Sequence, residues 1–322
     1  MNIPDRLIQF IVRERKFFIA THIRPEGDAL GSSLALSMAL ESMGKETTLY
    51  DRDPVPALYR FLPGHKRFTH TPSPLAHDGL PLLLLDCNEP ERAGLENVVI
   101  RRSAVIDHHE TIKEFGDIQW IEPHAAATGV MVYALIRKLG VRITKDMATN
   151  LYTAIAIDTG TFRFSNTTSD VLRIAAELVE SGADPGAIAG ELYETWSGGR
   201  FGLLMKVLNT LEITRGIAVT VVTKKMFSET GTAPEDTENF SNFPKMMEEI
   251  KVSLFLREIE EGWKVSLRSR GDYNVAEIAT RFHGGGHKNA AGCVIKGDLQ
   301  AAKAQLIDAI EGFRGSKGKE DK

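Results

Sequence analysis

The chain has 322 residues, of which 43% are hydrophobic and 25% charged, a composition typical of a globular protein with room for two domains. Its formal net charge of −4 argues against a general nucleic-acid coat protein, which normally carries a basic surplus, but leaves room for a locally basic pocket. Only Cys87 and Cys293 occur and no apolar run approaches the roughly 20 residues that span a bilayer, so we expect a cytoplasmic protein without disulfides, cysteine zinc site or membrane span.

Up to about Leu178 the chain alternates short apolar runs with helical patterns, which is typical of βα units around a mostly parallel sheet. Residues 17–22 are predicted to form a buried strand, 29–43 a helix that ends at Gly44, and 46–50 the next strand. Prolines make residues 51–81 rich in loops, with at most one short helix near 58–62, and the strand pattern resumes at Leu82. Further helices are predicted at about 126–139, 145–156 and 169–181.

The pattern weakens over residues 182–199, and a predicted helix at about 201–211 marks a connection to a new domain. Beyond it, residues 217–223, 251–257 and 263–268 alternate like half-buried strands, 274–282 and 299–313 are helical, and the long loop 228–244 is expected to be a flexible connection. The expected organisation is therefore a first domain over residues 1–190, a linker helix over 191–212, a smaller α/β domain over 213–314 and a disordered polar tail over 315–322.

Acidic residues and histidines follow apolar runs in four separate segments of the first domain. Asp107-His108-His109 follows Ala104-Val105-Ile106, and the other three segments lead to Glu26 and Asp28, to Asp86, and to Asp158. In open parallel sheets ligands bind beyond the carboxyl ends of the strands, so side chains that are distant in sequence can converge there. The candidate metal ligands are His22, Glu26, Asp28, Asp86, His108 and Asp158.

An oxygen-rich set with two imidazoles suits Mn²⁺, or less well Mg²⁺, Co²⁺ or Fe²⁺. Four clustered carboxylates without a cation would repel one another and raise one another's pKa values, which favours two bound divalent ions. Two such ions can share a bridging hydroxide and clamp both the attacking and the leaving oxygen of a phosphoryl group, so phosphate ester hydrolysis is the predicted reaction. The plainer alternative is that each Asp caps a helix and each His is an ordinary packed side chain, but the four segments together favour the metal site.

A second unusual segment, residues 282–292, contains three consecutive glycines followed by His287. Glycines permit close backbone approach to a ligand, and His287 can donate to a phosphate or stabilise a leaving oxygen. A glycine-rich turn between helix and strand is the alternative, but nearby arginines, whose guanidinium groups match phosphate oxygens, favour substrate binding. The predicted substrate-binding residues are Arg268, Ser269, Arg270, Gly285, Gly286 and His287.

These residues resemble the motifs of the DHH phosphoesterase superfamily. His22-x-x-Pro25-Glu26-x-Asp28-Ala29-x-Gly31-Ser32 is similar to its first motif, Asp86 to its second, Asp107-His108-His109 to its third and Asp158 to its fourth. The glycine-rich segment together with residues 266–269 resembles the DHHA1 domain, so the resemblance covers nearly the whole chain except the tail. Within the superfamily the chain is most similar to the branch of bifunctional oligoribonucleases and pAp phosphatases.

The resemblance implies an α/β fold in which a mostly parallel-sheet DHH domain precedes a smaller α/β DHHA1 domain, with the active site in the cleft between them. It also implies that Asp86 bridges two ions, one bound by His22 and Glu26 and the other by Asp28, His108 and Asp158. The catalytic residues would be His109, facing the substrate phosphate, and Asp107, which would support a neighbouring side chain. Two residues depart from the family's pattern. Glu26 stands where the family usually has Asp, so we expect retained activity with altered metal affinity, and His283 stands where many relatives carry another glycine.

The resulting hypothesis is a Mn²⁺-dependent hydrolase with two metal ions that cleaves very short RNA to mononucleotides, 3′-phosphoadenosine 5′-phosphate (pAp) to AMP, or both. An acidic chain lacks the long basic track that extended strands require, which favours short RNA or small nucleotides as partners. Neither a membrane nor a stable protein partner is indicated, and a homodimer stays open.

Three alternatives compete with this hypothesis. A linear or cyclic dinucleotide phosphodiesterase would use the same metal residues. A family II-like inorganic pyrophosphatase would also use them, but that branch ends in a motif rich in lysine and arginine rather than in three glycines with His287. A nucleotide-binding module with a decayed metal site is favoured only by Glu26.

Overall fold

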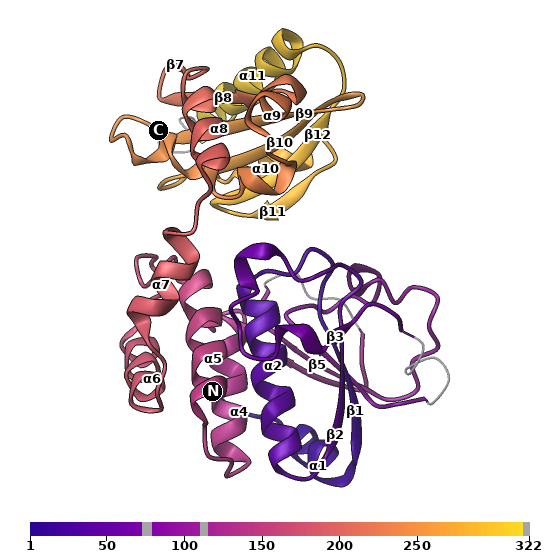
Figure 1. Ribbon diagram of the computed structural model, residues 1–322. Coiled ribbons are helices and arrows are strands. Elements are labelled where there is room, and N and C mark those ends of the chain that lie inside the picture. The colour runs from indigo at the N-terminus through magenta and orange to yellow at the C-terminus, as the bar shows by residue number, and fades with distance from the viewer. Residues whose placement is uncertain (73–78, 110–114, 318–322) are drawn as a thin grey trace. The chain divides into compact units, whose positions relative to one another are not determined.

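The computed structural model describes residues 1–72, 79–109 and 115–317, which form two compact units, Met1–Thr195 and Trp196–Lys322 (Figure 1). The division falls within the interval 191–212 that was expected to link two domains. Each unit has a β-sheet and a hydrophobic core of its own. None of the helices in the described parts of the chain is long and apolar enough to cross a membrane.

The first unit is built on a sheet of six strands in the order β3-β2-β1-β4-β5-β6, and every pair of neighbouring strands is parallel. The strands are β1 (Lys16–Ala20), β2 (Glu46–Tyr50), β3 (Phe68–Thr69), β4 (Leu82–Leu85), β5 (Ser103–Asp107) and β6 (Ile118–Ile121). The central strands are buried on both faces, which is why they appear in the sequence as nearly continuous apolar runs. The predicted mostly parallel sheet is confirmed.

Helices α2 (Gly27–Ser42) and α4 (Thr128–Lys138) cover one face of this sheet, and α5 (Lys145–Asp158) packs on these two helices, as Figure 1 shows. The other helices in the described part of the unit are α1 (Asp5–Arg13), and α6 (Ser169–Glu180) and α7 (Pro185–Tyr193), which pack against α5. Phe17 and Ile19 of β1 face the core beneath the helices, whereas Phe18 and Ala20 face a smaller cluster on the other side. Helix α7 lies where the sequence pattern weakened. Asp184 caps it by accepting the Gly186 and Ala187 N–H groups.

The contact between α2 and α5 explains a glycine of the first motif. A Cβ atom at Gly31 would lie 2.4 Å from the backbone oxygen of Asn150 in α5, so only glycine fits at this crossing. The close packing brings the first turn of α2 near the C-terminal end of α5, and both of these helix ends carry predicted metal ligands.

The second unit contains a mixed sheet in the order β11-β12-β10-β9-β8-β7, in which β8 and β9 are parallel and the other neighbours antiparallel. Its strands are β7 (Glu212–Thr214), β8 (Ile217–Val222), β9 (Val252–Ile259), β10 (Gly262–Ser269), β11 (Gly285–His287) and β12 (Ala290–Ile295). Its helices are α8 (Gly198–Leu208), α9 (Lys224–Thr230), α10 (Val275–Thr280) and α11 (Leu299–Lys317). Short 3₁₀ helices complete both units: Ala57–Tyr59, His65–Arg67, Glu91–Ala93, Pro234–Thr237, Phe240–Asn242 and Pro244–Met246.

Three expectations about the second half of the chain need correction. Helix α8, expected as a linker, packs into the second unit because Leu203, Leu204 and Val207 are buried with Phe240 and residues of the sheet. The loop 228–244, expected to be flexible, contains the end of α9 and the almost fully buried ring of Phe240. The tail was expected to be disordered from residue 315, but α11 continues to Lys317, and residues 318–322 lie outside the described residues.

Candidate metal centre

The predicted ligands come from the carboxyl edge of the first sheet and from two helix ends. Strands β1, β4 and β5 are neighbours, so His22 shortly after β1, Asp86 directly after β4 and His108 directly after β5 lie at the same edge. Asp28 lies in the first turn of α2. Asp158 is the last residue of α5, the helix predicted at about 145–156, and it reaches the same place from there.

The side chain of His108 lies at the centre of this group. Its Nε2 atom is 3.1 Å from Asp158 Oδ2, 3.5 Å from Asp86 Oδ1 and 3.7 Å from Asp28 Oδ2. On the other side of Asp86, the Nε2 atom of His22 is 3.5 Å from Oδ2. The two oxygens of Asp86 therefore face two different imidazoles.

Among the described residues, two sets of three have ligand atoms that all lie within 4.8 Å of one another and could each hold a metal ion. One set is Asp28, His108 and Asp158, and the other is Asp86, His108 and His109. The second set includes His109, which the sequence analysis assigned to the substrate. Its Nδ1 atom is 3.8 Å from Asp86 Oδ1 but only 2.7 Å from Asp107 Oδ1.

Backbone carbonyl groups orient both of the predicted histidine ligands. His22 Nδ1 lies 3.0 Å from the carbonyl oxygen of Ile23, and His108 Nδ1 lies 3.1 Å from that of Ala125. A carbonyl can only accept, so Nδ1 carries a proton in each ring and Nε2 faces the carboxylates, where a metal ion can take the place of the Nε2 proton. This is how metal-binding histidines are usually held.

The N-terminal end of α4 holds the carboxylates. The Thr128 and Gly129 N–H groups donate to Asp28 at 2.6 and 2.8 Å, Ser32 Oγ donates to it at 2.9 Å, and the Thr128 hydroxyl donates to Asp86 at 3.0 Å. Free N–H groups at a helix start are natural partners of anions. Sequence reasoning missed Thr128, although a Thr-Gly pair before an apolar helix was a usable signal.

Asp86 has a φ of 56°, in the left-handed region that residues other than glycine seldom adopt. Strain of this kind costs on the order of 1–3 kcal/mol and tends to occur at functional sites.

Asp107 forms a separate network with His109. It is fully buried, and its Oδ1 accepts the backbone N–H of His109 at 3.2 Å besides facing the ring Nδ1. Its Oδ2 accepts from the side-chain amide of Asn88 at 2.6 Å. Asp107 therefore supports His109 rather than the central cluster, and the buried Asn88, which sequence reasoning missed, holds Asp107 in turn.

The electrostatics of the cluster favour positive charge at its centre. Burial lowers the pKa of His22, but the hydrogen bond and charge of Asp86 outweigh it and raise the pKa to about 9. In His108 burial acts in the same direction, and Asp158, Asp86 and Asp28 raise the pKa to about 10. Burial and neighbouring carboxylates raise the pKa of Asp28 well above its ordinary value and raise that of Asp158. A divalent cation would satisfy this field in place of protons, so the residues fit a metal site.

Glu26 is placed differently from the other predicted ligands. It is exposed, it is the N-cap residue of α2, and neither of the two sets that could hold a metal ion includes it. Its part in metal binding stays a prediction.

Cationic side chains gather in the second unit around the predicted substrate residues. Burial and the charges of Arg268 and Arg270 lower the pKa of Lys245. Arg270 also donates to the carbonyl of Lys245 at 2.6 Å. Like charges held together in this way favour an anionic partner. Lys245 was missed because it directly follows the loop expected to be flexible.

Two of the predicted substrate residues take part in the β11–β12 hairpin. Ser269 is buried; its hydroxyl donates to the carbonyl of Tyr273 at 2.7 Å, and its backbone N–H donates to the carbonyl of Asn289, in the turn of the hairpin, at 3.0 Å. Its contact with substrate stays a prediction. Gly286 has a φ of 143°, and a Cβ there would lie 2.4 Å from the backbone oxygen of Ala290. Its close approach is therefore to β12 and not to a ligand, whereas a Cβ at Gly285 would meet open space. His287, the last residue of β11, is exposed.

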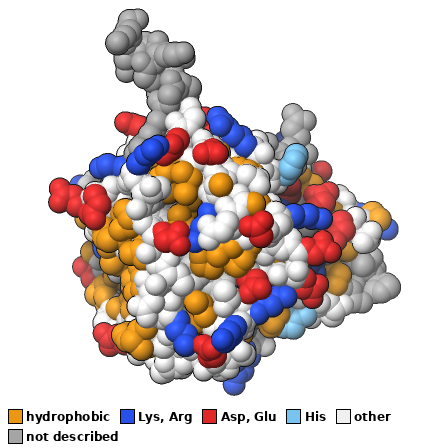
Figure 2. Space-filling model, turned by 90° about the horizontal axis from the view of Figure 1, so that it is seen from above, with side chains coloured by type: hydrophobic (Ala, Val, Ile, Leu, Met, Phe, Trp, Pro, Cys, Tyr) orange, Lys and Arg blue, Asp and Glu red, His pale blue; other side chains and the backbone are white. Residues whose placement is uncertain are grey.

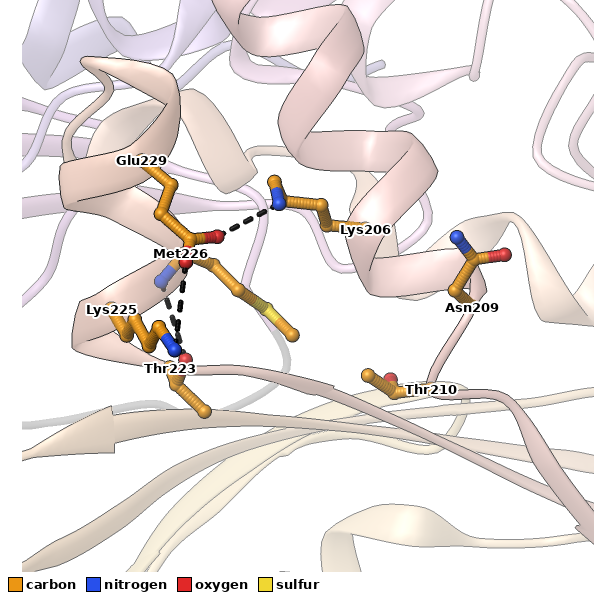
Figure 3. A pocket seen from close by; sticks show the side chains of 7 residues that line it. All are labelled: Lys206, Asn209, Thr210, Thr223, Lys225, Met226 and Glu229. Atoms are coloured by element: carbon orange, nitrogen blue, oxygen red, sulfur yellow. Dashed lines mark hydrogen bonds and ion pairs between the residues drawn. The ribbon is translucent and has the colours of Figure 1, made fainter.

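A hollow of about 320 Å³ in the second unit lies apart from these residues and is lined by Lys206, Asn209, Thr210, Thr223, Lys225, Met226 and Glu229 (Figure 3). Its charged groups are paired with one another, since Glu229 lies 2.8 Å from Lys206 Nζ and 3.8 Å from Lys225 Nζ. The Thr223 hydroxyl caps α9. The hollow therefore offers little unpaired polar surface to a ligand.

Comparisons with known proteins support the same interpretation. The N-terminal domain of the DHH family matches residues 16–155, and the DHHA1 domain matches residues 216–313. A Thermus thermophilus protein named bifunctional oligoribonuclease and PAP phosphatase NrnA is 40% identical over 311 residues, which cover 95% of this chain and 93% of that protein. The Bacillus subtilis protein of the same name is 25% identical over 296 residues, covering 90% and 92% of the two chains.

Among solved structures, an exopolyphosphatase-related protein from Bacteroides fragilis superposes with a TM-score of 0.90 at 28% identity. The superposition covers 97% of this chain and 96% of that one.

Proposed function

The chain belongs to the DHH family of phosphoesterases and carries a DHHA1 domain, and we propose that it hydrolyses very short RNA to mononucleotides and pAp to AMP. The observation that carries the proposal is the convergence of Asp28, Asp86, His108 and Asp158 within a few ångströms at the carboxyl edge of the sheet. The names of relatives that match almost the whole chain supply the substrate class.

We propose that this cluster holds two divalent ions, with Asp86 between them. His108, Asp28 and Asp158 would hold one ion, and His22 the other, because the two Asp86 oxygens lie 3.5 Å from the Nε2 atoms of different histidines. Carboxylate oxygens combined with neutral imidazoles support Mn²⁺ as the physiological ion. Such ions, when bound, supply an activated water and neutralise charge that develops on a phosphoryl group.

The remaining side chains orient the substrate. His109, whose Nδ1 is held by Asp107, is the proposed contact to the phosphate that reacts. In the second unit Lys245, Arg268 and Arg270 are the proposed grip on the remaining phosphate oxygens, with His287 beside them. Binding there would relieve the mutual repulsion of the cations.

The distribution of charge supports short substrates. On the face that Figure 2 shows, the described Lys and Arg side chains are interspersed with Asp and Glu and with hydrophobic side chains, and they form no continuous basic track there. Proteins that bind long nucleic-acid strands normally carry such a basic track along the path of the strand. A net charge of −4 therefore favours a small nucleotide or a short oligonucleotide as substrate. We further propose that the enzyme acts in the cytoplasm, which its two buried free cysteines support.

The alternatives receive less support. A cyclic-di-AMP phosphodiesterase named GdpP, from Geobacillus thermodenitrificans, is 26% identical to this chain, which spans about half of its length (50%). A module with a decayed metal site is not favoured, because both sets of ligand atoms are assembled.

The test is hydrolysis by the purified protein with Mn²⁺ of pAp, RNA dimers to pentamers, cyclic dinucleotides, pyrophosphate and a long RNA, each assayed separately. We expect AMP from pAp and mononucleotides from short RNA, and loss of both activities in Asp28→Ala. The matched control is Asp170→Ala, which removes an exposed carboxylate from α6 in the same unit. Pyrophosphate or a cyclic dinucleotide as the preferred substrate, or an active Asp28→Ala, would show the proposal to be wrong.

A further inference from the structure

The loop of residues 159–166 directly follows the proposed metal ligand Asp158, and its last residue, Asn166, contacts the backbone of Asp158. The side-chain amide of Asn166 donates to the carbonyl groups of Asp158 and Ala126, both at 3.1 Å, and so closes the loop. Thr161 and Phe162 have φ values of 59° and 61°, in the left-handed region. A backbone held in this way at a functional site indicates that the positions of its side chains matter.

Two neighbouring aromatic residues of this loop behave differently. Phe162 packs edge-on against Tyr152 with 5.5 Å between ring centroids, and it contributes to the core of the first unit. Phe164 is 50% exposed, and one part of its ring rests on Gly160, where a Cβ would lie 2.4 Å from the ring. The loop thus fixes the position of an aromatic ring that the core does not use.

A hollow of about 280 Å³ adjoins this loop and is lined by Thr161, Arg163 and Tyr193. The Tyr193 ring is 44% exposed and its hydroxyl is hydrogen-bonded to that of Thr161, so the ring has a fixed position. Arg163 Nε donates to the carbonyl of Gly160 at 2.7 Å, which orients the guanidinium. The Arg163 side chain has no other hydrogen bond or ion pair with the residues that the structure describes. Its two terminal amino groups can therefore donate to a ligand.

We propose that this hollow, together with the exposed ring of Phe164 in the adjoining loop, is a nucleobase subsite for the short RNA substrate, a proposal that rests on the function proposed above. A base stacks on the ring of Tyr193, which lines the hollow, or on that of Phe164 beside it, and the guanidinium of Arg163 contacts the phosphate attached to that nucleotide. Exposed aromatic rings next to an arginine are the usual means of holding single-stranded nucleic acid without reading its sequence. The volume suits one nucleotide and not a strand.

The subsite has a chemical consequence for substrate choice. Because the loop starts at Asp158, a base held there places the sugar and phosphate of its nucleotide near the cluster of carboxylates. Binding energy from the base then contributes to positioning the reacting phosphate. A substrate without that base should therefore lose reactivity as well as affinity.

The experiment is a double cycle that removes the ring from the protein and the base from the substrate. Kinetics of wild type and Phe164→Ala are measured with an RNA dinucleotide and with dinucleotides that are abasic at either position. We expect Phe164→Ala to lower kcat/KM for the intact dinucleotide by about 10- to 100-fold, as for other stacked bases. For the dinucleotide that lacks the stacked base, we expect wild type and variant to be equal.

Three further proteins complete the test. Phe164→Trp keeps an aromatic ring and should retain most of the activity, and Tyr193→Ala should act in the same direction as Phe164→Ala. Phe201→Ala is the matched control, because Phe201 is similarly exposed (56%) but lies on α8 of the second unit. Thermal melting and bound Mn²⁺ are measured for every variant to separate a folding or metal defect from a binding defect.

The outcomes separate this inference from the proposed function. If wild type does not cleave RNA dinucleotides, the proposed function is wrong. If wild type cleaves them and Phe164→Ala and Tyr193→Ala do so equally well, or if the loss in these variants is the same with both abasic substrates as with the intact one, the nucleobase subsite is wrong.

Discussion

Replacing Asp28 by Asn tests whether the buried carboxylates form a metal site. Asp28 is 1% exposed and accepts three hydrogen bonds, two of them from backbone N–H groups at the start of α4. Asparagine has the same shape but turns one acceptor into a donor, so one of those N–H groups would face an NH₂ group at a cost of about 1–3 kcal/mol. The change also removes repulsion from Asp86 and Asp158, which offsets this cost. We therefore expect a small change in Tm in the absence of metal.

The response to Mn²⁺ should differ much more. An ion that binds only the folded state at 100 times its Kd stabilises that state by about 2.7 kcal/mol. In a unit the size of Met1–Thr195, each kcal/mol raises Tm by roughly 2–4 °C, so Mn²⁺ should raise the wild-type Tm by about 5–10 °C. Asp28→Asn should show less than half of this increase, because it loses a ligand from the cluster around His108.

The assay is thermal unfolding in EDTA and in a Mn²⁺ titration, together with the metal content of the purified protein. Asp170→Asn removes an exposed carboxylate of the same unit and should respond to Mn²⁺ as the wild type does. An equal rise in Tm for Asp28→Asn and wild type would refute Asp28 as a ligand, whatever the variant's activity.

Three further results are expected. Asp107→Asn should lower kcat at least about 10-fold and leave the Mn²⁺ content unchanged, because it loosens the hydrogen bond that orients His109. A drop in bound metal would contradict this role of Asp107. Gly31→Ala should lower the free energy of unfolding of the first unit, measured in urea, by on the order of 1–3 kcal/mol, because the new methyl group would clash with the Asn150 carbonyl. Unchanged stability would show that α2 and α5 can move apart at this crossing. Burial raises the pKa of Asp51 from 3.8 to about 7, so the stability that its proton contributes is complete below pH 3.8 and is lost as the pH rises through 7. The free energy of unfolding of the metal-free protein should therefore decline over this range, and the decline should be smaller in Asp51→Asn. An identical pH dependence in both proteins would exclude Asp51 as its source.

The elements of the first unit were predictable because their apolar patterns are local. Strands β1, β4 and β5 are buried on both faces and therefore stand out as apolar runs, and the acids and histidines that follow them are visible in the same segments. Helix α7 was not predicted, because its small and apolar residues have little periodicity and its start depends on the cap at Asp184.

The partners of the predicted ligands could not be found in the same way. Asn88 and Thr128 acquire their roles by bonding to Asp107 and Asp86, and nothing near them in sequence shows those contacts. Lys245 comes near Arg268 of β10 and Arg270 just after it only because the preceding segment folds onto the sheet, with Phe240 buried beneath it.

The sequence by itself determined the α/β class, the family resemblance and the identity of most candidate ligands, because the type of a side chain and its place after an apolar run are local properties. Only the tertiary structure decided that Asp158, at the end of a helix, meets the ligands that follow the strands, that Glu26 stands apart from the sets of ligand atoms, and that Ser269 and Gly286 take part in a hairpin. It also decided that Phe164 is exposed while Phe162 is packed. Such outcomes depend on distances between segments far apart in the chain, which strand order and helix packing set and which no local pattern contains.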